Sequence, residues 1–143
     1  MKMRKLWLVV SLILLSSIAS AGKVNERPVV IDLDQSRAAG DQLTARTADN
    51  DIELIGCGIK VYDDGVNPVW SFGFCQARDS ADRSIQCFTG NADLLEAIKG
   101  ASAYAWISFS WREDPDFGFE CSSIQFSTNS FYLPDPNLKP KEK

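Results

Sequence analysis

Hydrophobic and polar residues alternate in several short runs along this chain of 143 residues. Period-two alternation is typical of β-strands that bury one face. We predict such strands at residues 52–61, 69–77, 83–88, 103–111 and 117–128. Alternation in the run 28–35, with Val29, Ile31 and Leu33 on one face, indicates an extra N-terminal strand.

One stretch shows helical spacing instead. Residues 92–99 place leucine and isoleucine on one face, Asn91 can cap the start, and Gly100 can end the helix. The expected order is therefore β-β-β-α-β-β, an α+β domain that is mainly antiparallel β-sheet with one short helix. A right-handed crossover through the helix would make the fourth strand parallel to the third, and the fifth strand would run back.

Composition divides the chain into four parts. Residues 1–21 have the basic, apolar and small-residue regions of a secretory signal peptide, and the apolar run is too short for a spanning helix. Residues 22–51 hold the N-terminal strand and, from residue 36, a flexible linker or weakly held edge segment. Residues 52–133 form a disulfide-stabilised β-rich domain. Residues 134–143 contain three prolines and are expected to be disordered.

Cleavage of the signal peptide changes the charge. Three of the 15 basic residues lie in 1–21, so 12 remain against 19 acidic residues, a net charge of -7. An acidic chain repels nucleic acid and anionic membrane surfaces, so we expect neither as a partner. We also expect no membrane span after cleavage, because cleavage removes the apolar run within residues 1–21. The predicted location is secreted or periplasmic.

Four cysteines, Cys57, Cys75, Cys87 and Cys121, lie in apolar, β-prone runs. Their intervals of 18, 12 and 34 residues and the absence of histidine exclude a zinc site of the usual spacing. An exported chain with four cysteines is expected to form two disulfides. We favour the pairs Cys57–Cys75 and Cys87–Cys121. The main alternative is Cys75–Cys87, because turns centred in their loops would place Cys57, Cys75 and Cys87 in one row across the sheet.

Acidic residues are concentrated in the turns. The predicted topology gathers several turns at one end of the domain, where oxygen ligands from separate loops could bind calcium. The plainer interpretation is that aspartate is common in solvated turns. The candidate binding residues in these turns are Asp63, Asp64, Asp93, Glu113, Asp114 and Asp116.

Aromatic residues offer a second kind of candidate site. Trp70, Phe72 and Phe74 share one face of a predicted strand, which is typical of a core but also of a platform that stacks on a sugar or a protein partner. Trp111 lies beside an acidic turn at a strand end, so we expect it to be partly exposed and include it among the binding residues.

Catalytic chemistry has little support in the sequence. Without histidine, neither a Ser-His-Asp nor a Cys-His arrangement can form, and a small five-strand domain can hardly enclose the cleft that a carboxylate pair needs. We therefore expect a non-enzymatic binding module without a cofactor. One hypothesis is an acidic inhibitor or partner of a basic exported protein, such as a lysozyme or a protease. The other is a polysaccharide- or calcium-binding domain of the cell envelope.

Overall fold

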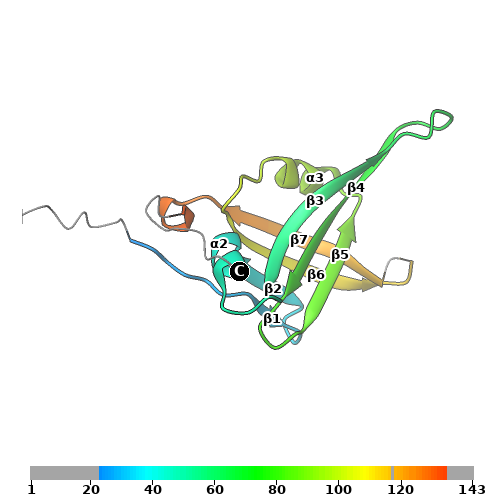
Figure 1. The fold of residues 1–143 in the computed structure, drawn as a ribbon. Helices are drawn as coiled ribbons and strands as arrows, with labels where there is room; N and C mark the ends of the chain where they lie inside the picture. Colours follow the sequence, from blue (N-terminus) through cyan, green and yellow to red (C-terminus); the bar gives the residue numbers. More distant parts are fainter. Residues whose placement is uncertain (1–22, 117, 135–143) are drawn as a thin grey trace, which may run out of the picture.

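The computed structural model describes residues 23–116 and 118–134 and is mostly one β-sheet with few helices (Figure 1). The predicted signal peptide and nearly all of the predicted disordered tail lie outside these residues. The seven strands are β1 (Val30–Asp32), β2 (Arg37–Asp41), β3 (Leu54–Tyr62), β4 (Trp70–Arg78), β5 (Ser84–Thr89), β6 (Trp106–Asp114) and β7 (Gly118–Ser127). The helices are α2 (Gln42–Thr47), α3 (Ala92–Lys99) and the 3-10 helix η1 (Ser130–Tyr132).

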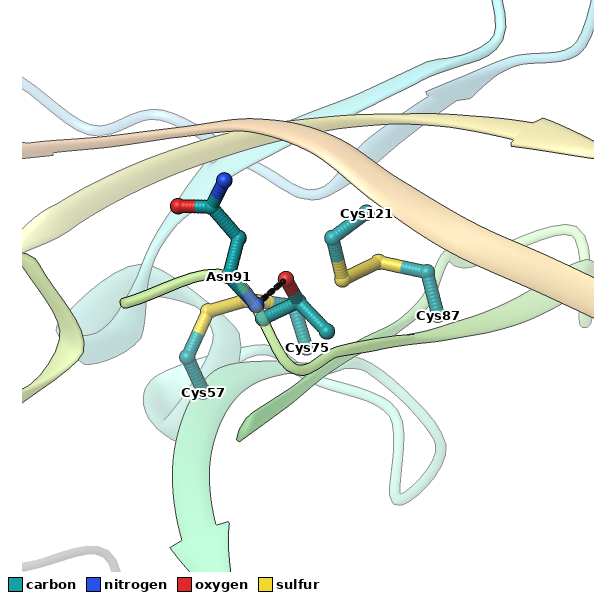
Figure 2. Close-up of a disulfide and its surroundings, with 6 residues drawn as sticks. Cys57, Cys75, Cys87, Asn91 and Cys121 are labelled. Carbon is teal, nitrogen blue, oxygen red and sulfur yellow. Dashed lines mark hydrogen bonds between the residues drawn. A yellow bond between two sulfur atoms is a disulfide. The ribbon is translucent and has the colours of Figure 1, made fainter. Parts of the chain in front are cut away.

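Strands β3, β4 and β5 form the predicted antiparallel meander. Cys75 lies opposite Cys57 on one side and opposite Cys87 on the other. The disulfides join Cys57 to Cys75 and Cys87 to Cys121, which is the favoured pairing. The first disulfide ties β3 to β4, and the second ties β5 to β7 (Figure 2).

Helix α3 has the predicted bounds and covers one face of this meander. The Asn91 side chain accepts hydrogen bonds from the first backbone N–H groups of the helix, and Gly100 follows its last turn. At Gly73 in β4, a Cβ atom would lie 2.6 Å from the Cδ1 atom of Ile98. The absence of a side chain at this position lets the helix approach the sheet closely.

The predicted direction of the last two strands is wrong. The sheet order is β1-β2-β6-β7-β5-β4-β3, so β7 rather than β6 lies beside β5. β7 is parallel to β5, and β6 is antiparallel to β7. The turn between β6 and β7 therefore lies at the opposite end of the strands from the turn between β3 and β4.

A β-bulge in β7 allows both parts of this strand to direct apolar side chains into the core. Ser122 is skipped in the pairing of β6 with β7, which reverses the alternation of β7 at this point. Phe119 and Cys121 before the reversal, and Ile124 and Phe126 after it, consequently all contact the core. Without the bulge, Cys121 would point away from Cys87.

Most of the segment from residue 36 to residue 51 is regular secondary structure, namely β2 and α2, so its interpretation as a flexible linker or weakly held edge is wrong. β2 pairs with both β1 and β6, and the Asp41 side chain caps α2. At Gly40, a Cβ atom would lie 2.9 Å from the Cα atom of Val29. The small residues of this segment therefore serve close packing. β1 is shorter than the predicted strand, and Leu33 lies in the exposed turn that follows it.

The core is built from the inner face of the sheet, with Phe109, Ile107 and Ile31 among its most deeply buried side chains. None of the described helices has the length and apolar character needed to cross a membrane.

Candidate binding surface

The acidic turns lie in separate places. Asp63 and Asp64 follow β3 at the end of the β3–β4 hairpin, and Asp93 lies in the first turn of α3. Near the β6–β7 turn, at the other end of the strands, lie Glu113, Asp114 and Asp116. Within residues 23–116 and 118–134, no group of three or more histidine, cysteine or acidic side chains could hold a metal ion. The predicted convergence of these turns is wrong because it depended on the direction of the last two strands.

Trp111 is buried rather than partly exposed. Only 7% of its surface is accessible, and its ring lies 6.1 Å from Phe109 and 6.4 Å from Phe119, measured between centroids. β6 continues to Asp114, three residues beyond the predicted strand end, so Trp111 faces the core like Ile107 and Phe109. It cannot form part of a binding surface in this arrangement.

The end of the β3–β4 hairpin projects from the body of the sheet (Figure 1). β4 pairs with β5 only from Gly73 onward, so the stretch from Trp70 to Phe72 pairs with β3 alone. Every residue from 61 to 70 is exposed. We call residues 60–72 the tip. A two-stranded ribbon is marginally stable in water and needs cross-strand contacts to hold its shape.

Aromatic rings provide these contacts on the outer face of the hairpin. Tyr62 stacks on Trp70 with 4.6 Å between ring centroids, Trp70 lies 5.7 Å from Phe72, and Phe72 lies 5.8 Å from Phe88. We call these four rings the aromatic row. Although they contact one another, Trp70 remains 53% exposed and Tyr62 43% exposed. The row thus leaves two large rings open to a ligand.

The outer position of the aromatic row follows from strand parity. Cys75 is fully buried, and residues 70, 72 and 74 are out of phase with it along β4, so their side chains lie on the opposite face. The core interpretation of Trp70 is therefore wrong, whereas Phe72 and Phe74 are half-buried. The disulfides in Figure 2 mark the inner face of the sheet.

Beside the aromatic row, the loop that joins β3 to β4 carries two carboxylates. Asp63 accepts a hydrogen bond from the backbone N–H of Gly65. Asp64 accepts hydrogen bonds from the backbone N–H groups of Asn67 and Val66 and from the Asn67 side chain. The hydrogen bonds from Asn67 and Val66 lower the pKa of Asp64 to about 2. The loop therefore stays negatively charged even in fairly acidic solution.

Lys60, the one cation of the tip, is directed back toward the sheet. Its ammonium group lies 5.7 Å from the centroid of the Phe74 ring. Phe74 in turn lies over Gly58, where a Cβ atom would come within 2.8 Å of the ring. The far end of the tip, around Tyr62 and Asp64, consequently carries negative charge beside exposed aromatic rings.

A cavity of about 350 Å³ lies between α2, the start of β3 and the loop before β6. Glu53 on its wall is engaged within the fold, because its two carboxylate oxygens accept hydrogen bonds from the backbone of Val29 and the side chain of Asn50. Gln42, also on the wall, accepts a hydrogen bond from the backbone of Ala105. Because these polar groups already bond to other segments of the fold, the tip is a stronger candidate for a binding site than this cavity.

Comparisons with protein-family models, curated proteins and solved structures found no match to this chain. Function must therefore be inferred from the chemistry of the surface. The tip combines exposed aromatic rings with a negative charge that persists in fairly acidic solution.

Proposed function

We propose that this protein is an exported, non-enzymatic binding module that holds a basic protein partner on the tip of the β3–β4 hairpin. The observation that carries the proposal is the pair of exposed, stacked rings, Tyr62 and Trp70, beside Asp63 and Asp64 on a projecting ribbon. Exported location is supported by the two disulfides, which persist in oxidising compartments.

The chemistry of the tip suits a cationic side chain. An arginine or lysine over an exposed aromatic face gains about 0.5–1 kcal/mol, and a nearby carboxylate adds a charged acceptor. Tryptophan and tyrosine are also enriched among the residues that dominate protein–protein affinity. The chain has a net charge of -4, which becomes -7 without residues 1–21, and this charge would attract a basic partner from a distance.

A projecting ribbon can also enter a cleft. The tip extends beyond the three-stranded part of the meander, and the Cys57–Cys75 disulfide fixes its base. Pre-organisation of this kind lowers the entropy lost on binding. Inhibition of a basic exported enzyme, by occupation of its substrate cleft, is the form of this function that best fits the shape.

The test is a binding measurement on the purified, oxidised protein. We expect it to bind one or more of a panel of basic exported enzymes, and the affinity to fall between low salt and about 0.5 M salt because screening weakens the attraction. The double variant Tyr62→Ser/Trp70→Ser should lose at least about tenfold in affinity. Leu33→Ser, which removes an exposed apolar side chain from the β1–β2 turn, is the matched control and should bind normally.

Two outcomes would contradict the proposal. One is the absence of binding to every basic enzyme in the panel at low salt, and the other is equal loss of affinity in Leu33→Ser and in the double variant. Quenching of tryptophan fluorescence by polysaccharides would instead favour the second candidate, a glycan-binding envelope domain. That candidate is supported by the exposed ring of Trp70 alone.

A further inference from the structure

One edge of the sheet ends in a strand without a neighbour. β3 is the last strand in the sheet order and pairs only with β4 among the described residues. Near its start, β3 borders the cavity beside α2, at Leu54 and Ile55. Toward the tip it becomes exposed, and 63% of the Val61 surface is accessible. The exposed part of the edge is therefore the stretch from Lys60 to Tyr62, and Ile59 beside it is half-buried.

The register shows which backbone groups this edge offers. The Cα atoms of Cys57 and Cys75 are only 4.0 Å apart, a spacing typical of the non-hydrogen-bonded pairs of an antiparallel ladder. Because such pairs alternate along the strand, Ile59 and Val61 also belong to non-hydrogen-bonded pairs with β4. Their N–H and C=O groups therefore point away from β4, toward the open edge.

The usual protection of an edge strand is weak here. Natural sheets guard such edges with lysine, proline or a bulge. β3 has no proline, its pairing with β4 shows no register shift, and its one lysine, Lys60, contacts the ring of Phe74 on β4. An incoming strand would meet open backbone groups at Val61, and its side chains on the outer face would lie beside Tyr62, with Asp64 beyond.

We propose that the edge of β3 at Ile59 and Val61 accepts an extended segment of the basic partner as an additional β-strand. This inference rests on the proposed function and specifies how the partner is held. Backbone hydrogen bonds supply affinity in this mode, and the side chains at alternate positions supply specificity. An arginine or lysine of the added strand would lie next to Tyr62 and Asp64, where the charge is complementary.

The probe is a capped heptapeptide of alternating valine and arginine. Two controls accompany it: the same peptide with every backbone nitrogen methylated, and a peptide of alternating valine and glutamate. We expect the parent peptide to bind, and both controls to bind at least about tenfold more weakly because they lack the backbone donors or the positive charge. Equal binding of the parent and the N-methylated peptide, or no binding of the parent at millimolar concentration, would overturn the edge mode.

A substitution in the protein, rather than in the peptide, tests the same backbone hydrogen bonds. Val61→Pro removes an N–H group that points away from β4, so the β3–β4 ladder keeps its hydrogen bonds. It should weaken binding of the parent peptide about tenfold, whereas Val61→Thr, which keeps the N–H group, should bind as the unaltered protein does. If Val61→Pro does not fold, the N-methylated peptide against the unaltered protein decides.

Amide hydrogen exchange gives an independent readout. In the free protein, the amides of Ile59 and Val61 should exchange fast and those of Gly58 and Lys60 slowly, and the parent peptide should protect Ile59 and Val61. Protection of Val61 that grows with protein concentration in the absence of peptide would overturn the inference in favour of a second copy of the chain. Salt-sensitive binding of basic enzymes that is unchanged in Val61→Pro would overturn the edge mode while leaving the proposed function intact.

Discussion

The two halves of the β3–β4 hairpin are built from the same strands but have different surroundings. In the inner half, the Cys57–Cys75 disulfide joins the strands, β5 pairs with β4, and α3 packs over Gly73. In the tip, β4 has no second neighbour among the described residues, and every side chain from 61 to 70 is exposed. One half of the hairpin is therefore scaffold, and the other half is surface.

The difference separates stability from recognition within one element. Apolar residues of the inner half contact the core, and their burial stabilises the fold. Those of the tip, including Val61, Val66 and Trp70, bury little and contribute little in this way. Exposed apolar residues on a projecting element are typical of an interaction site. The following predictions test how complete this separation is.

The largest contrast is expected between two aromatic residues. Phe109 is fully buried, so Phe109→Ala should lower the free energy of unfolding by about 3–5 kcal/mol. Trp70→Ala removes a half-exposed ring from a cross-strand stack and should cost below about 1 kcal/mol. Urea unfolding followed by circular dichroism measures both. A cost for Trp70→Ala close to that for Phe109→Ala would show that the tip is part of the scaffold.

The two disulfides should differ less in their contributions to stability than Phe109 and Trp70 do. They close loops with sequence separations of 18 for Cys57–Cys75 and 34 for Cys87–Cys121. The chain-entropy relation then gives a stabilisation of about 3 kcal/mol for the first and nearly 4 kcal/mol for the second. Unfolding of the two double alanine variants tests this order. Only the loss of Cys57–Cys75 should also weaken partner binding, since it releases the base of the tip.

The smallest contrast concerns two aspartates in turns at opposite ends of β4. Asp79 is buried, and burial raises its pKa, but hydrogen bonds and the charge of Arg83, 2.6 Å away, outweigh this effect and lower the pKa below its usual value of 3.8. Asp79→Asn should cost about 1–2 kcal/mol at pH 7, because solvent screens the half-exposed Arg83. Asp64→Asn, in the exposed loop of the tip, should leave stability nearly unchanged.

The pH dependence has a definite sign. A carboxylate whose pKa is lower in the folded state stabilises the protein above its unfolded pKa, near 3.8, and loses this effect as the pH falls through the folded pKa. The unaltered protein should therefore lose more stability between pH 5 and about 2 than Asp79→Asn does. Identical pH profiles for the two proteins would contradict this role of Asp79.

Local signals made part of the fold predictable. Asn91 and Gly100 bound α3 because a side-chain cap and a helix stop act within a few residues. Turns centred in their loops placed Cys75 opposite Cys57 and also opposite Cys87, so this geometry favoured the observed disulfide Cys57–Cys75 without excluding Cys75–Cys87. These features depend on neighbours in sequence or on one short turn.

Non-local features were missed. The insertion of β7 between β6 and β5 depends on a contact between distant segments and on the bulge at Ser122. The change of phase between Cys121 and Ile124 marks the bulge in the hydrophobic pattern, but it does not reveal which strands β7 pairs with. The small residues of β2 resembled a linker because β6, the strand with which β2 pairs, lies much later in the chain. The close approach of Val29 to Gly40, which needs a small residue, likewise appears only in the folded structure.

The candidate site could have been recognised in part. A cysteine in a disulfide is expected to face the core, so Cys75 indicates that Trp70, Phe72 and Phe74 face outward. For Trp111, by contrast, the acidic turn beside it suggested exposure, whereas its alternation with Phe109 along the strand indicates the core face. No local pattern could reveal how far the β3–β4 hairpin extends beyond β5, because this length depends on where β5 stops pairing with β4.

The position of the Cys57–Cys75 disulfide determines what happens when a protease cuts the tip. Val66, with 88% of its surface exposed, lies at the end of the hairpin, and exposed loop ends are preferred sites of proteolytic cleavage. Any cut between residues 58 and 74 falls inside the loop that this disulfide closes. Both fragments would remain covalently joined, so a nicked molecule would keep its full mass and its folded body while losing the continuity of its tip.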